Sequence, residues 1–169
     1  MTDPRAVRPH MPDYGVPVEL DGVLPWSWAS ERLVRTRNYW VVTASAYGRP
    51  HSLPVWGVWR TSPTAAFAFS CGESSRKAGN MAANPQVCVT GDDTVECVSV
   101  EGRAERVTDA VEQAVLIAAY VDKYAEPDGR DELAEFVGQH ALWLVRPERA
   151  FGIIERADEF SARATKWVW

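Results

Sequence analysis

The chain has 169 residues, a formal net charge of −5, and 46% apolar and 24% charged residues, the balance of an ordinary globular domain. This acidic balance argues against a nucleic-acid or anionic-membrane partner, and no apolar run has the length of a membrane span. The three cysteines and three histidines show no disulfide or metal-ligand spacing, so we expect a cytoplasmic protein that holds no metal.

The first 25 residues carry five prolines and little hydrophobic periodicity, which is typical of an extended arm. We therefore divide the chain into an N-terminal arm, residues 1–25, and one domain, residues 26–169. The domain opens with a predicted helix at residues 26–37, which turns Trp26 and Leu33 inward and leaves its arginines exposed. These arginines form either a solvated face or one wall of an anion-binding groove.

A β-hairpin follows, with strands predicted at residues 39–45 and 51–60. Pro54 and Gly57 lie inside the second strand, where proline removes a hydrogen-bond donor and glycine often marks an irregularity. They indicate an edge, a bulge or a bend rather than a regular central strand. Such features are common where a ligand approaches the backbone.

Four further strands are predicted from alternating and β-branched residues, with Gly102 marking a bulge and Pro147 a break. They span residues 65–70, 86–91, 95–107 and 141–155. Most connections between strands are short, so the sheet should be mainly antiparallel. Six or so strands with peripheral helices predict a mainly β fold, a small β-barrel. The terminal residues 161–169 contain two tryptophans and are expected to dock against the domain.

Two helices are predicted before the last strand, at residues 109–125 and 131–138. Asp109 caps the first of them, and Glu112 stands where it would complete a capping box. The buried face of this helix is predicted from the apolar residues that recur along it. They are Val111, Ala114, Val115, Ala118, Ala119 and Val121.

A short helix predicted at residues 76–83 is unusual in its charge. Ser74 or Ser75 can cap its free N–H groups, and Asn84-Pro85 ends it. Arg76 and Lys77 lie in its first turn, where the helix dipole disfavours each cation by roughly 0.3–1 kcal/mol. Either the two side chains are simply solvated, or they hold an anion such as a phosphate together with the helix N–H groups.

Three segments together resemble a known family. They are the hairpin of residues 43–56, the Ser75-Arg76-Lys77 and Asn84-Pro85-Gln86-Val87 segments after the strand at 65–70, and the terminus at 164–169. Their order and spacing are similar to those of split β-barrel flavin-binding proteins related to pyridoxamine 5′-phosphate oxidase, and most similar to actinobacterial flavin/deazaflavin oxidoreductases. The resemblance spans about residues 26–169. It implies an antiparallel split β-barrel with peripheral helices and a homodimer with two cofactor sites at the subunit interface.

The resemblance also implies roles for particular residues. Lys77, supported by Ser75 and Arg76, would contact the cofactor phosphate. The bent strand at residues 51–60 would lie against the tricyclic ring. The family commonly has arginine where this chain has Lys166, which removes a bidentate contact. The cofactor contacts that it implies are Leu53, Pro54, Val55, Trp56, Phe69, Ser70, Ser75, Arg76, Lys77, Lys166 and Trp167.

The sequence shows no catalytic triad, carboxylate pair or metal cluster, which fits hydride transfer by a cofactor. The leading hypothesis is an oxidoreductase that uses a reduced deazaflavin coenzyme of the F-420 type on an unsaturated or conjugated small molecule. One alternative is an FMN-dependent oxidase or reductase, and another is a non-catalytic carrier of flavin, deazaflavin or haem. No catalytic residue is nominated, because the available proton donors Tyr47, His51 and Tyr124 are more simply explained as structural.

Two further expectations follow from charge and aromatic content. The oligoglutamate tail of the deazaflavin would need a basic groove in an acidic protein. Its candidate residues are Arg5, Arg8, Arg32, Arg35, Arg37 and Arg49. The eight tryptophans offer more apolar surface than one small barrel hides, so we expect an obligate dimer.

Overall fold

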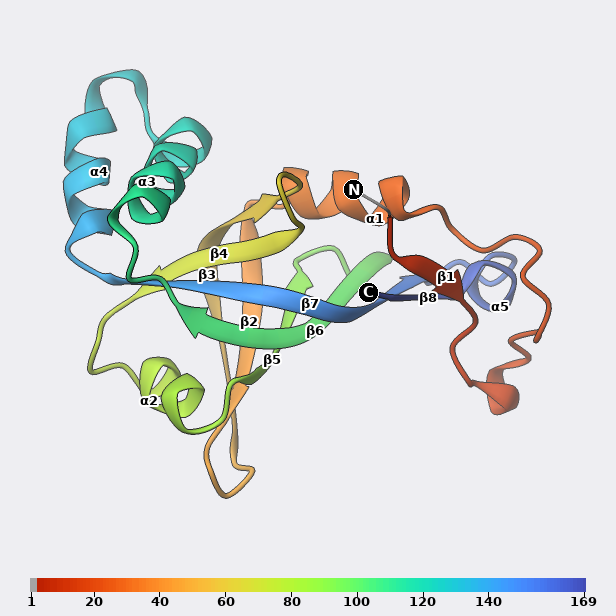
Figure 1. Cartoon of the computed structure of the whole chain (residues 1–169). Coiled ribbons are helices and arrows are strands. Elements are labelled where there is room, and N and C mark those ends of the chain that lie inside the picture. The colour runs from red at the N-terminus through yellow and green to blue at the C-terminus, as the bar shows by residue number, and fades with distance from the viewer. Residues whose placement is uncertain (1–2) are drawn as a thin grey trace.

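The computed structural model describes residues 3–169, and its centre is a closed barrel of six antiparallel strands (Figure 1). Around the barrel the strands follow the order β7-β4-β3-β2-β5-β6, and β6 pairs with β7 to close it. The elements in chain order are β1 (Arg5–Val7), the 3-10 helix η1 (Pro12–Tyr14), α1 (Trp26–Arg35), β2 (Asn38–Ala44), β3 (Pro50–Arg60), β4 (Ala66–Cys71), α2 (Arg76–Ala83), β5 (Gln86–Gly91), β6 (Glu96–Arg106), α3 (Ala110–Tyr124), η2 (Pro127–Gly129), α4 (Arg130–Gly138), β7 (Ala141–Ile154), α5 (Phe160–Arg163) and β8 (Thr165–Val168). The predicted mainly β, antiparallel barrel with peripheral helices is confirmed.

The first four residues of strand β4, Ala66 to Phe69, are all apolar, and both faces of the strand are buried along them. Phe67 and Phe69 point into the barrel, where they pack beside Tyr39 of β2. Ala66 and Ala68 point the other way and lie under the helices α3 and α4. A continuous apolar run is the pattern expected of a strand that is covered on both sides.

Strand β7 is long enough to pair with three other strands. Its first half pairs with β4, its second half with β8, and nearly its whole length with β6. The irregularity predicted at Gly102 is confirmed by a register shift between Glu101 and Gly102, although the extra residue, Glu148, belongs to the facing strand β7. The predicted break at Pro147 is wrong: Pro147 lies opposite Gly102, and β7 continues through it with the bulged residue directly after it.

The buried face of α3 differs from the predicted one. Val111 and Val115 are 73% and 51% exposed, and of the predicted residues only Val121 is fully buried. The other buried residues are Leu116, Tyr120 and Tyr124. The helix is apolar on two sides, so hydrophobicity alone does not decide which side faces the barrel. The tyrosine hydroxyls decide it, because their hydrogen-bond partners lie in the sheet. Asp109 caps α3 as predicted, but the Glu112 carboxylate pairs with Arg60 and forms no capping box.

The N-terminal arm is held against the domain by its backbone and by Arg8. Strand β1 pairs with β8, which confirms that the C-terminus is docked. The Arg8 guanidinium donates to the carbonyls of Glu19 (2.8 Å) and Ala164 (2.9 Å). Of the helices within residues 3–169, none combines the length and the apolar character that a bilayer crossing requires.

We predict opposite effects for alanine at two glycines. A Cβ on Gly102 would lie 2.1 Å from the Arg146 carbonyl oxygen, so Gly102→Ala should lower the free energy of unfolding by about 1–3 kcal/mol. Gly79, in the interior of α2, has open space around it, and Gly79→Ala should raise that free energy by about 0.5–1 kcal/mol. Urea unfolding measures both. Equal stability of the two variants would contradict the assigned bulge.

Candidate functional site

Strand β3 pairs with a different strand along each of its two halves. Its pairing with β2 covers Pro50 to Trp56, whereas its pairing with β4 begins at Gly57, opposite Phe69. Within the described residues, the first half of β3 therefore has one edge without a strand partner, as Pro54 and Gly57 predicted. The side chains of Leu53 and Trp56 along this half are 44% and 43% exposed.

The Tyr120 side chain of α3 separates β3 from β4 at this point. Its hydroxyl accepts the N–H of Ser70 (3.0 Å) and donates to the carbonyl of Trp56 (2.6 Å). Trp56 and Ser70 would be the next pair of the ladder, so the hydroxyl occupies the place of a strand-to-strand hydrogen bond. Burial raises the pKa of this hydroxyl well above its usual value, which keeps it protonated and able to donate.

The indole of Trp56 is held by a second tyrosine of α3. The Tyr124 ring stacks on it, with centroids 4.7 Å apart and planes within 4°. The Tyr124 hydroxyl lies 2.6 Å from the Arg37 carbonyl and accepts the N–H of Gly57 (2.9 Å), which gives it a structural role. Beside it, the Lys123 ammonium donates to the Gly57 carbonyl. Burial, and to a smaller extent the nearby Arg37 charge, lowers the pKa of Lys123 to about 8.

A cavity of about 200 Å³ opens where β3 and β4 separate. Three of the predicted contact residues line it, namely Val55, Trp56 and Ser70. No local pattern indicates the other lining residues, Tyr120, Phe136 and Val137, because α3 and α4 reach this strand gap only through the tertiary fold. The Phe69 side chain is fully buried in the barrel, so only its backbone borders this gap.

The start of α2 has the structure that its sequence predicts. Ser75 is the N-cap, and its Oγ accepts the N–H of Ala78 (3.3 Å). Arg76 is exposed and Lys77 half-buried, and neither forms an ion pair among residues 3–169. Buried Asn80 donates to the hydroxyl of Thr43 (2.9 Å), which fixes this helix against β2. The N–H groups of the first turn of α2 and the side chains of Arg76 and Lys77 therefore lie together at the start of this helix.

Arg106 is a third cation near this helix start, and the sequence analysis missed it. It ends strand β6 and pairs with Glu73, which lies in the short loop just before Ser75. Both partners are substantially exposed, so the pair contributes little stability and is easily exchanged for another anion. Only the closure of the barrel brings the end of β6 to this loop.

Within a single chain, the fold does not bring the two terminal residues to α2. Lys166 and Trp167 lie on β8, which pairs with the second half of β7, whereas α2 follows β4 near the start of β7. Trp167 is fully buried and packs edge-on against Trp26. The role of Lys166 and Trp167 as cofactor contacts stays a prediction.

The six arginines expected to form a basic groove are not gathered in a single chain. Arg37 and Arg49 flank β2 at its opposite ends, and Arg5 lies on β1 beside β8. Arg35 ends α1, and Arg32 of the same helix is paired with Glu96. Arg8 is engaged by backbone carbonyls. The prediction fails because helix, hairpin turn and arm are attached to different parts of the barrel.

Comparisons with known proteins agree with this architecture. The family model described as pyridoxamine 5′-phosphate oxidase matches residues 29–153. A conserved hypothetical protein, Rv2991 of Mycobacterium tuberculosis, superposes with a TM-score of 0.67 at 18% identity, over 82% of this chain and 90% of that one. The haem storage protein HutZ of Vibrio cholerae gives 0.56 at 20% identity, over 73% and 87%. An FAD-binding protein of Mesorhizobium loti gives 0.56 at 16% identity, over 85% and 93%. No curated protein matches the sequence significantly.

We predict that Tyr120→Phe destabilises the site and the fold together. Without the hydroxyl, the Ser70 N–H and the Trp56 carbonyl lose their shared partner, which should cost about 1–3 kcal/mol. Urea unfolding measures the loss, with Tyr47→Phe as the control, because the Tyr47 side chain is 98% exposed. If the two variants unfold alike, the hydroxyl bridge does not hold the strands.

Proposed function

The chain belongs to the pyridoxamine 5′-phosphate oxidase family, and from that membership we propose that it is an oxidoreductase using a phosphate-bearing flavin or deazaflavin. The observation that carries this proposal is the unpaired edge of β3 close to a helix start with two cations that form no ion pair among residues 3–169. One surface suits a flat conjugated ring, and the other suits a phosphate.

The start of α2 would hold the phosphate. The N–H groups of the first turn, the Lys77 ammonium and the Arg76 guanidinium are donors suited to its oxygens. Ser75 uses its oxygen as an acceptor for the helix cap, so its hydroxyl proton remains able to donate to the phosphate. Arg106 lies beside this position, where it would exchange the Glu73 carboxylate for a carboxylate on the tail of a deazaflavin.

The first half of β3 would hold the ring. Its free edge offers backbone donors and acceptors in the plane of the sheet, and Leu53 and Val55 offer apolar contact. Trp56, held flat by Tyr124, adds an aromatic surface beside the gap. The side chain of Phe69 would take no part, because it lies inside the barrel.

A bound cofactor of this kind supplies the hydride, and the chain's own residues orient it and exclude water. The Tyr120 hydroxyl stays engaged by the strand backbone, and Lys123 is turned toward Gly57 and Tyr39. Neither is therefore assigned a proton transfer.

The deazaflavin remains our leading cofactor, on the sequence resemblance, and FMN is the alternative. The arginines that were expected to form a groove for the deazaflavin tail are dispersed over the barrel. Arg76 and Arg106 are therefore the cations that remain near the proposed phosphate position. A non-catalytic haem carrier is a second candidate, because HutZ of the same fold is a haem storage protein.

We also propose that two copies of the chain complete each site. Trp40, Leu53 and Trp56 are large apolar side chains on the adjacent strands β2 and β3, and each is more than 40% exposed. An interface between copies would cover them. A partner's terminal strand could then bring its lysine to the ring, which one subunit does not achieve.

Lys77→Ala is expected to weaken cofactor binding by about 1.5–3 kcal/mol, the range for a hydrogen bond to a charged group. The stability of the fold should be unchanged, because Lys77 forms no ion pair among the described residues. Calorimetric titration measures the affinity, and Arg35→Ala removes an exposed cation elsewhere as a control. Unchanged affinity in Lys77→Ala would place the phosphate elsewhere. A loss in Lys166→Ala would require the partner subunit's contribution.

The two cofactors are distinguished by parallel fluorescence titrations. Arg106→Ala should weaken deazaflavin binding about two- to fivefold, the scale of an exposed ion pair, and FMN binding less, because only the deazaflavin has a carboxylate tail. Arg130→Ala removes another exposed, ion-paired arginine as the matched control. Tighter FMN binding at both low and high salt would favour the FMN-dependent alternative. Haem absorbance in the purified protein, with neither flavin binding, would favour the carrier.

A further inference from the structure

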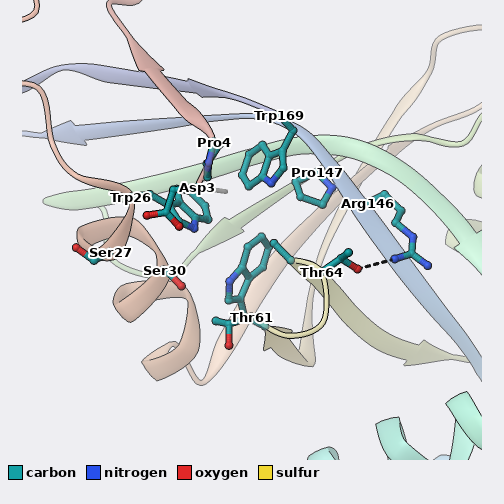
Figure 2. Close-up of a pocket in the computed structure, with 12 residues that line it drawn as sticks. Asp3, Pro4, Trp26, Ser27, Ser30, Thr61, Thr64, Arg146, Pro147 and Trp169 are labelled. Atoms are coloured by element: carbon teal, nitrogen blue, oxygen red, sulfur yellow. Dashed lines mark hydrogen bonds between the residues drawn. The ribbon is translucent and has the colours of Figure 1, made fainter. Parts of the chain in front are cut away.

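Strand β3 changes its strand partner at Gly57, and side chains of α3 hold the backbone there. The pairing with β2 ends at Trp56, and the pairing with β4 begins at Gly57. The far end of β3 lies elsewhere, beside a cavity of about 500 Å³ that Trp26 of α1 and Arg146 of β7 border (Figure 2). The partner change leaves backbone groups to be bonded by side chains, and α3 supplies these side chains.

Two neighbouring residues of α3 share the hydrogen bonds of Gly57. The Gly57 N–H donates to the Tyr124 hydroxyl (2.9 Å), and the Lys123 ammonium donates to the Gly57 carbonyl (2.9 Å). The Tyr124 hydroxyl also lies 2.7 Å from that carbonyl and 2.6 Å from the carbonyl of Arg37. A tyrosine hydroxyl has one proton, so it cannot donate to both carbonyls at full strength. Because Lys123 supplies the Gly57 carbonyl, the tyrosine proton is left for Arg37.

The surroundings of Lys123 favour the loss of its proton. The side chain is half-buried, and its ammonium donates to the Tyr39 hydroxyl (2.7 Å) and lies 4.7 Å from the centre of the Tyr39 ring. The charged side chains near it are Arg37, which precedes β2, and Asp92, which follows β5. Burial and, to a smaller extent, Arg37 lower the pKa of Lys123 to about 8, while Asp92 acts in the opposite direction.

The tyrosines around Lys123 keep their protons over the same pH range. Burial raises the pKa of Tyr39, Tyr120 and Tyr124 above the ordinary value for tyrosine. Of the α3 side chains bonded to the β3 backbone, Lys123 is therefore the one that changes charge near pH 8. Its bonds to the Gly57 carbonyl and to Tyr39 are charge-assisted, and such bonds are roughly twice as strong as neutral ones. The neutral amine keeps two N–H donors but loses that advantage.

A weaker Lys123 bond affects the half of β3 that lies before Gly57. The Tyr124 proton is again shared between two carbonyls, so Gly57 and the start of β2 are held less firmly. Within residues 3–169, this half of β3 has a strand partner on one edge only. The Trp56 ring is affected as well, because it stacks on the ring of Tyr124.

We propose that Lys123 is a positioning residue whose protonation controls this strand edge: the ammonium fixes β3 at Gly57, and the neutral amine loosens the edge and the Trp56 ring. The ring of a cofactor bound along this edge would consequently bind more tightly to the protonated form. This consequence rests on the function proposed above, whereas the control of the strand does not.

NMR spectra of the full chain without cofactor test the control of the strand. Between about pH 6.5 and pH 9.5, the Gly57 carbonyl carbon and the Trp56 indole N–H should shift together, with a midpoint near pH 8. The carbonyl carbon of Gly79 in α2 serves as the internal control and should not show this step.

Two variants assign the step to the lysine. Lys123→Met should remove it, and Lys123→Arg, which stays charged, should hold both signals near their low-pH positions. If Lys123→Met does not fold, the Cε signal of Lys123 in the native chain must titrate with the same midpoint as Gly57. An unmoved Gly57 signal, a different midpoint for Lys123, or the same step in Lys123→Met would overturn the proposal.

Fluorescence titrations with FMN and with the deazaflavin, at about pH 7 and pH 9.5, test the consequence for the cofactor. The affinity of the native chain should fall about three- to tenfold at the higher pH, the scale of one charge-assisted hydrogen bond. Lys123→Arg should keep its affinity, and Lys123→Met should bind equally weakly at both pH values. Affinity independent of pH in the native chain would overturn the link to the cofactor ring. Binding of neither cofactor at pH 7 would instead contradict the proposed function, and the Gly57 titration would still decide the role of Lys123.

Discussion

The Tyr120 hydroxyl accepts the Ser70 N–H and donates to the Trp56 carbonyl where β3 and β4 would otherwise form their next pair. This insertion ends the ladder without leaving either backbone group unsatisfied, which a buried strand end requires. It also fixes α3 on the barrel, because the same tyrosine is almost fully buried. The opening beside β3, and with it the candidate site, depends on this one side chain and its neighbour Tyr124.

The closure of the barrel depends on β7 and on its bulge opposite Gly102 of β6. Because β7 pairs with β4, β6 and β8, it joins the two ends of the six-strand sheet and also carries the terminal strand. Gly102 allows the β6 backbone to pass within a distance of the Arg146 carbonyl that any Cβ would block. The two ends of β3 differ. The first half borders the cavity under α3 and α4, and the far end borders a cavity lined by Trp26 of α1 and by the terminal Trp169.

Features that depend on neighbouring residues were predicted well. Helix α2 runs from Arg76 to Ala83 with Ser75 as its cap, as expected, because a cap and a proline stop act within a few residues. The irregularity at Gly102 was predicted for the same reason. The buried face of α3 was predicted wrongly, because hydrophobicity alone does not reveal that Tyr120 and Tyr124 have hydrogen-bond partners in the sheet.

By itself, the sequence determined the positions of the six barrel strands and of α1 to α4, the antiparallel barrel and the cations at the start of α2, since these follow from periodicity, turn residues and local capping. Only the tertiary structure decided which residues share a site. It brought Tyr120 and Phe136 to the strand gap and Arg106 to the α2 loop, and it separated Arg37 from Arg49. The reason is physical: contacts between distant segments are set by how the barrel closes, and no local pattern encodes that closure.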